Sequence, residues 1–179
     1  MLQPQERERF EACILPHLDA AYNLSRWLLR DPLDAEDVTQ EAILRAFKFF
    51  SGFRAGDARA WLLQIVRNCC YTWMQKKRPT ETLEDLPENA VPSDELTPET
   101  LAIVGVDRDR VRQALESLPA QFREIVVLRE LEGCSYKEIA AITARPIGTV
   151  MSGLARARKQ LKAALSEPLG KEMEARRAL

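Results

Sequence analysis

Four cysteines and one histidine are the residues of this chain best suited to bind a metal or to react. Cys13 lies four positions from His17. Cys69 and Cys70 are adjacent and Cys134 stands apart, so no pair has the CxxC spacing of a zinc site. Adjacent cysteines in a helical pattern are usually small buried side chains, although a vicinal pair can also sense redox state. We expect reduced thiols, no metal and no cofactor.

Other arrangements that support catalysis are missing from the sequence. The chain has no G-x-x-x-x-G-K phosphate loop, no paired carboxylates in an apolar setting and a single histidine. An enzyme acting on a small-molecule substrate is therefore the least favoured class of protein.

Cationic side chains, in contrast, concentrate between Ser135 and Lys162. The basic residues there are Lys137, Arg145, Arg156, Arg158, Lys159 and Lys162, against the single acid Glu138. Ser135 and Glu138 form an S-x-x-E capping box for a short helix, and a longer helix is predicted from about Pro146 to Leu165. A turn at 143–145 separates the two. This order predicts a helix-turn-helix, whose second helix enters the major groove of DNA.

The second helix of this motif carries the residues expected to meet DNA. Gly148 and Thr149, at its positive end, are placed to bind a phosphate. Ser152, Arg156 and Lys159 are expected to share one exposed strip, and arginine can form two hydrogen bonds to guanine. The alternative is a solvated basic face on an ordinary helical hairpin.

The N-terminal part predicts three or four helices. An apolar pattern begins at Phe10 and continues through Leu29, until Asp31-Pro32 breaks it, and Asp34 is expected to cap the next helix.

That next helix carries an acidic face. Asp34, Asp37 and Glu41 align on one side, and Glu36 and Gln40 extend the polar surface. Acidic residues in a first turn stabilise a helix by opposing its dipole, but this face continues for two turns. We expect it to dock on a basic protein surface.

Aromatic and cationic residues alternate in the following stretch, from Phe47 to Arg78. Besides Lys48, it contains the cations Arg54, Arg59, Arg67, Lys76, Lys77 and Arg78. This composition is typical of surfaces that stack unpaired bases and hold a single strand. We expect Trp61 to be buried, and Arg67, Asn68 and Tyr71 to be exposed. The loop from Phe53 to Asp57 has room for a flipped base.

Between these two parts, residues 79–106 contain no Lys or Arg, seven acidic residues and four prolines. Such a composition predicts a linker between two units. We therefore expect an all-α fold with two small helical domains, 1–78 and 107–166, and a tail at 167–179. No apolar stretch approaches the roughly 20 residues of a membrane span, and we expect a cytoplasmic protein.

Three motifs in this order resemble the extracytoplasmic-function group of RNA polymerase sigma factors, in the sigma-70 family. The resemblance runs from about Phe10 to Leu165. Its motifs are the acidic segment 34–41, the stretch from Phe53-Arg54 through Trp61-Leu62 to Asn68, and the helix-turn-helix built from 135–140 and 146–150.

The resemblance implies three binding regions. It implies that Asp34, Glu36, Asp37, Gln40 and Glu41 bind core polymerase. It implies that the −10 promoter element is met by Arg54, Gly56, Asp57, Arg67, Asn68, Tyr71, Lys76 and Lys77. It implies that the −35 element is met by Lys137, Arg145, Pro146, Gly148, Thr149, Ser152, Arg156 and Lys159. An anti-sigma factor is a further expected partner.

Two features limit this reading. Gly153 stands where many members of the family have arginine, so one phosphate contact is missing. An ordinary helix-turn-helix regulator, dimeric on a palindrome and not joined to the polymerase, is the alternative from another class.

Overall fold

The computed structural model describes residues 4–54, 56–77 and 108–166. These residues form helices and short connections without a strand, so the predicted all-α fold is confirmed for this part of the chain. We refer to residues 4–77 as the N-terminal half and to 108–166 as the C-terminal half. The predicted linker, 79–106, and tail, 167–179, lie outside the described residues.

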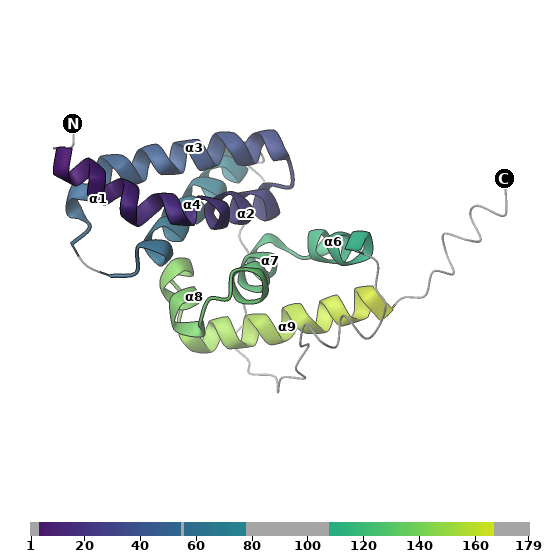
Figure 1. The fold of residues 1–179 in the computed structure, drawn as a ribbon. Coiled ribbons are helices and arrows are strands. Elements are labelled where there is room, and N and C mark those ends of the chain that lie inside the picture. The colour runs from purple at the N-terminus through teal and green to yellow at the C-terminus, as the bar shows by residue number, and fades with distance from the viewer. Residues whose placement is uncertain (1–3, 55, 78–107, 167–179) are drawn as a thin grey trace.

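The N-terminal half begins the chain of helices seen in Figure 1. Its elements are α1 (Pro4–Ile14), η1 (Leu15–His17), α2 (Leu18–Leu29), α3 (Pro32–Phe49), η2 (Phe50–Gly52) and α4 (Ala58–Lys77). The apolar pattern predicted a helix continuing from Phe10 to Leu29, whereas the chain breaks it at the 3-10 turn η1. Pro16 lies in this turn and has no N–H to donate, which favours the interruption.

An aromatic cluster closes one end of the N-terminal half. The rings of Phe10 and Phe50 meet edge to face with centroids 5.2 Å apart. Phe53 and Trp61 follow, with ring centroids 4.9 Å apart. Phe50 is fully buried, whereas Trp61, which was expected to be buried, is half-buried at the edge of the cluster.

The start of α3 differs from the sequence-based prediction. Asp31 caps the helix, because its side chain accepts hydrogen bonds from the backbone N–H groups of Leu33 at 2.8 Å and Asp34 at 3.1 Å. The prediction that Asp34 is the cap was wrong. Pro32 is tolerated directly after Asp31, because the first N–H of a helix has no partner within the helix.

The C-terminal half contains the helix-turn-helix. Its elements are α6 (Arg108–Ser117), α7 (Ala120–Val126), the π-helical turn η3 (Val127–Leu131), α8 (Tyr136–Thr143) and α9 (Ile147–Ser166). Gly133 has a φ of 65°, the left-handed conformation that glycine adopts without strain, and it reverses the chain before α8.

Local hydrogen bonds fix both ends of α8, as the sequence predicted. The Glu138 N–H donates to the Ser135 hydroxyl at 3.2 Å, and the Ser135 N–H donates to the Glu138 carboxylate at 2.6 Å. Ala144 ends the helix with a φ of 54°. This tight reversal places α9 across α8 and completes the predicted helix-turn-helix.

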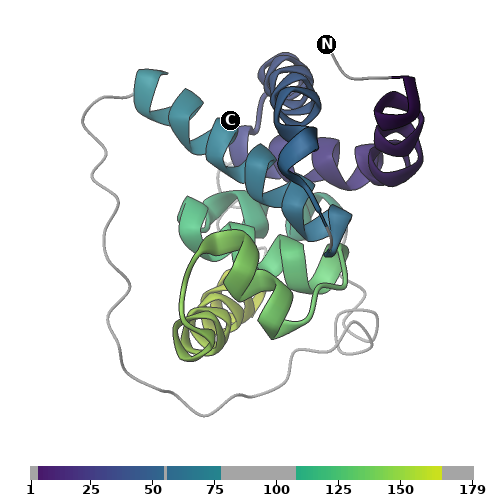
Figure 2. The same cartoon turned by 90° about the vertical axis from the view of Figure 1, so that its left-hand side faces the viewer.

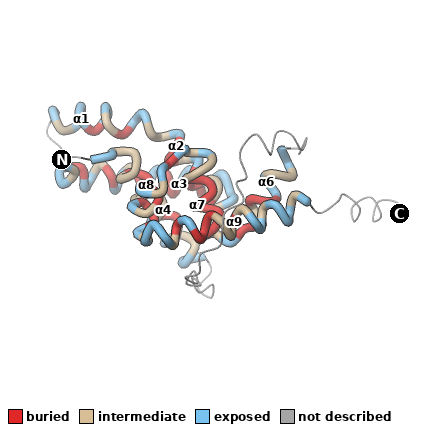
Figure 3. Tube along the Cα trace, turned by 90° about the horizontal axis from the view of Figure 1, so that it is seen from below, coloured by how far each residue is buried: buried red, intermediate tan, exposed pale blue. Residues whose placement is uncertain are grey.

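The two halves pack against each other. In Figures 1 and 2 α8 lies against α4 and α7 lies near α2, so that α7 is enclosed between the N-terminal half and α9. Buried positions accordingly gather on α7 in Figure 3, whereas the end of α9 is mostly exposed. One continuous cluster of buried apolar side chains extends through both halves.

Among the described residues, no helix combines the length and apolar character that crossing a membrane requires.

Candidate nucleic-acid and protein interfaces

The acidic face of α3 is solvent-exposed. Glu36, Asp37, Gln40 and Glu41 point outward, while Val38, Ala42 and Ala46 are buried against the rest of the N-terminal half. Each acidic position therefore stands on the side that another protein can reach. An exposed carboxylate face of this kind is complementary to a basic surface.

Two leucines on α3 were not singled out from the sequence. Leu33 is 70% exposed and Leu44 is 65% exposed, and their spacing relative to Asp37 puts them on the same side of the helix. Exposed apolar side chains beside charges are common at protein interfaces. The signal was present in the sequence, because both leucines are out of register with the buried Val38 and Ala42.

Asp34 is less exposed than the rest of this face because Lys77 binds it. The Lys77 ammonium lies 2.6 Å from the Asp34 carboxylate and joins the end of α4 to the start of α3. This hydrogen bond holds the pKa of Asp34 below its ordinary value. Two residues assigned to different binding regions therefore contact each other.

The loop before α4 and one strip of the helix remain open to solvent. The exposed residues of the loop and of this strip of α4 are Arg54, Gly56, Asp57, Asn68, Lys76 and Lys77. The Asp57 side chain accepts hydrogen bonds from the N–H groups of Arg59 at 2.9 Å and Ala60 at 3.2 Å, so it also caps α4.

The prediction that Tyr71 and Arg67 are exposed was wrong. Tyr71 is only 8% exposed, and the Arg67 guanidinium lies over its ring at 4.4 Å. Burial raises the pKa of Tyr71 above its ordinary range, and the neighbouring Glu124 adds to the shift. The prediction of exposure failed because it considered α4 alone, and the C-terminal half covers this side of the helix.

Glu124 of α7 lies between two arginines. Its side chain is fully buried, and its carboxylate binds Arg67 at 2.8 Å and Arg145 at 3.0 Å. The two arginine side chains are 14% and 19% exposed. Burial raises the pKa of Glu124, and both guanidinium groups oppose that shift. Arg145, predicted to meet DNA from the helix-turn-helix, is thus engaged inside the protein.

The start of α9 presents a different strip from the one predicted. Ser152 is buried and donates a hydrogen bond to the backbone oxygen of Thr149 at 3.2 Å, so its placement on an exposed strip was wrong. Met151 is exposed instead, and Arg156 is half-buried. The helix packs against α7 as well as α8, and this wider contact turns Ser152 inward.

The remaining residues predicted at the −35 element lie at or near the surface. Lys137, Pro146, Gly148 and Lys159 are exposed, and Thr149 is half-buried. Together with Met151 they form a cationic and apolar surface at the helix-turn-helix. Its chemistry suits phosphate groups and base edges in a major groove.

Three of the four cysteines have buried environments that favour the protonated thiol. Cys69, Cys70 and Cys134 are buried, and burial raises the pKa of Cys70 to about 12 and that of Cys134 to about 11. Cys70 contacts the Ser25 hydroxyl at 3.7 Å. Within the described ranges there is no group of three or more His, Cys, Asp or Glu side chains arranged to hold a metal ion.

Known proteins match both halves of the chain. The family "Sigma-70 region 2" matches residues 13–80, and "Sigma-70, region 4" matches residues 108–161. The ECF RNA polymerase sigma factor SigE of Mycolicibacterium smegmatis is 35% identical over 158 residues, which are 86% of this chain and 60% of that protein. The ECF RNA polymerase sigma-E factor of Escherichia coli is 35% identical over 137 residues, which are 72% of each chain.

A solved structure supports the same assignment. The sigma factor RpoE of Bartonella quintana, determined in complex with the anti-sigma factor NepR, superposes with a TM-score of 0.69 at 27% identity. The superposition covers 89% of this chain and 98% of RpoE. The chain therefore belongs to the sigma-70 family, in its extracytoplasmic-function group of RNA polymerase sigma factors.

Proposed function

We propose that this chain directs core RNA polymerase to a class of promoters. In this proposal residues 1–78 act as region 2 and residues 107–166 as region 4, with 79–106 as the linker and 167–179 as a tail. The observation that carries it is the exposed acidic face of α3 within the half that matches region 2. In an ordinary regulator that does not join the polymerase, this face would be solvated surface without a binding role.

The division of labour follows from the surfaces. Glu36, Asp37, Gln40 and Glu41 bind the polymerase, flanked by the apolar Leu33 and Leu44. The loop at 54–57 and the α4 strip around Asn68 meet the −10 element. Capture of unpaired bases there supplies the energy for opening the duplex, and the protein itself catalyses no reaction.

Region 4 meets the −35 element through the start of α9. Arg156 and Lys159 supply cationic contacts, and Gly148 and Thr149 approach the phosphate backbone. The exposed Met151 offers an apolar contact for a thymine methyl group. These contacts read the −35 element, and the −10 contacts read the unwound −10 element and hold the opened strand.

We also propose an anti-sigma factor as a partner and the cytoplasm as the site of action. The support for the partner is the likeness to RpoE, which was determined with NepR bound. That likeness spans both halves of this chain. A partner that binds both halves at once would keep the chain from the polymerase.

Transcription in vitro tests the proposal. Purified core polymerase is combined with this protein and a fragment library of the source genome. We expect discrete start sites that depend on the protein and share two spaced upstream motifs. A protein that binds DNA but yields no start site would refute the proposal and favour the ordinary regulator.

A further inference from the structure

The first helix reaches the loop that precedes α4. Two neighbouring residues of α1, Arg9 and Phe10, lie against Phe50 at the start of this connection. Phe10 is buried and meets the Phe50 ring edge to face, with centroids 5.2 Å apart. The Arg9 guanidinium lies over the same ring, 5.0 Å from its centroid, which is a cation–π contact. Phe50 therefore joins α1 to the segment that leads into the loop.

Arg9 also contacts the backbone of the loop. One of its terminal nitrogen atoms donates a hydrogen bond to the backbone oxygen of Phe53. The Phe53 N–H donates to the backbone oxygen of Phe50 at 2.9 Å. The Phe53 ring lies between the rings of Phe50 and Trp61, with centroids at 5.8 and 4.9 Å. The first residue of the loop is thus held by its ring and by both polar groups of its backbone.

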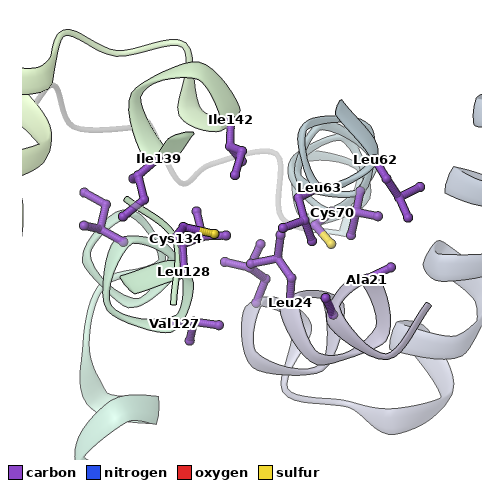
Figure 4. Close-up of a cluster of buried hydrophobic side chains, with 14 of the residues drawn as sticks. Ala21, Leu24, Leu62, Leu63, Cys70, Val127, Leu128, Cys134, Ile139 and Ile142 are labelled. Atoms are coloured by element: carbon purple, nitrogen blue, oxygen red, sulfur yellow. The ribbon is translucent and has the colours of Figure 1, made fainter. Parts of the chain in front are cut away.

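The far end of the loop is fixed by α4. Asp57 caps this helix through its carboxylate. The helix is anchored in turn by Leu62 and Leu63, which belong to the buried apolar cluster shown in Figure 4. The exposed Arg54 and Gly56 therefore lie between two fixed points, the contact with α1 at one end and the helix cap at the other.

A second arginine of α1 shows that this contact is specific to Arg9. Arg7 and Arg9 are both exposed and lie two positions apart on the same helix. Arg7 pairs with Glu11 of its own helix at 3.0 Å, an exposed contact that reaches no other element. Arg9 instead spans from α1 to the loop, and it lies outside residues 13–80, which match region 2.

We propose that Arg9 is a positioning residue for reading of the −10 element, which holds Arg54 and Gly56 in the orientation that meets the unwound bases. The proposal rests on the proposed function, because that function assigns the loop to the −10 element. A loop that is ordered for only part of the time binds its preferred base more weakly, in proportion to the ordered fraction. A base that the loop does not bind gains nothing from the order. Arg9 therefore adds discrimination between sequences without contacting DNA itself.

Three variants of the full chain separate this role from a change in charge. Arg9→Met removes the guanidinium and keeps an apolar stem of similar length. Arg9→Lys keeps a cation that can lie over Phe50 and donate to the Phe53 oxygen. Arg7→Met is the matched control, because it makes the same change in charge and residue type on the same helix. Circular dichroism verifies that each variant is folded.

Hydrogen exchange measured by NMR reports the order of the loop without DNA or polymerase. We expect the Phe53 N–H to exchange about fivefold faster in Arg9→Met than in Arg7→Met, the effect of losing one exposed cation–π contact. Arg9→Lys should stay near the wild-type rate. The amide of the buried Leu24 in α2 should be unchanged in all variants, which excludes a general loss of stability. An unchanged Phe53 rate in Arg9→Met would overturn the proposal.

Transcription with saturating core polymerase reports the reading of the −10 element. The template is a promoter found with the wild-type chain, in which each base of the −10 or of the −35 element is varied singly. We expect Arg9→Met to lower discrimination at the −10 element about fivefold, with discrimination at the −35 element unchanged and with Arg9→Lys close to wild type.

Two other results would overturn the positioning role. Discrimination at the −10 element equal to that of Arg7→Met would show that the reading does not need the Arg9 contact. Uniformly weaker transcription from all −10 variants would make Arg9 a phosphate contact. A wild-type chain that yields no start site would refute the proposed function itself, and hydrogen exchange would still decide whether Arg9 holds the loop.

Discussion

Substitution of Glu124 by glutamine should destabilise the chain strongly. The side chain is fully buried and binds two arginines, one from each half. Removing one partner of a buried ion pair typically costs 3–5 kcal/mol, because the remaining charge is left in a poorly solvated place. Arg67 and Arg145 keep some exposure, so the lower end applies and we expect a loss of about 3 kcal/mol.

Thermal and urea unfolding measure this loss. For a chain of this size 1 kcal/mol changes Tm by roughly 2–4 °C, so the expected decrease is roughly 6–12 °C. Glu130→Gln is the control, because its ion pair with Arg158 lies nearer the surface and should contribute at most about 1 kcal/mol. Equal losses in the two variants would refute the reasoning that burial makes Glu124 critical.

Three further predictions concern the binding surfaces and α8. Asp37→Arg should abolish association with core polymerase in a pull-down while circular dichroism stays unchanged; retained association would remove the docking role of α3. Arg156→Ala should reduce discrimination between −35 sequences by about 1–3 kcal/mol, measured by competition binding, whereas uniform weakening on all sequences would make it a phosphate contact. Ser135→Ala should cost about 1 kcal/mol in urea unfolding. It should also raise the pKa of Glu138, which the Ser135 hydrogen bonds hold below its ordinary value, so that less stability is lost on acidification through that pKa; the Ser135 backbone N–H remains as a donor. An unchanged NMR titration of Glu138 would contradict this cause.

Features that depend on local chemistry were predictable from the sequence. The Ser135 capping box, the left-handed Gly133 and the long α9 follow from residue types at fixed spacing. The outward direction of Asp37 and the inward direction of Val38 follow from helical periodicity. These signals need no knowledge of the rest of the chain.

Burial by tertiary contacts was not predictable in the same way. Glu124 looks like a solvent-facing residue of an amphipathic helix, but Arg67 of the other half and Arg145 of its own half both lie against its buried side chain. The inward positions of Tyr71 and Ser152 have the same origin, because each depends on a tertiary contact that helical spacing does not encode. The sequence therefore predicted the exposed residues of the candidate site correctly. It predicted exposure wrongly for residues that another helix covers.

The shared core has a practical consequence for dissecting this protein into fragments. A fragment ending after α4 would expose Leu24 and Leu63, and one beginning at α6 would expose Leu128, Cys134 and Ile142. Such contiguous apolar surface lowers solubility and favours self-association. Fragments intended for study will express best when these side chains are replaced by polar ones, or when the two fragments are produced together.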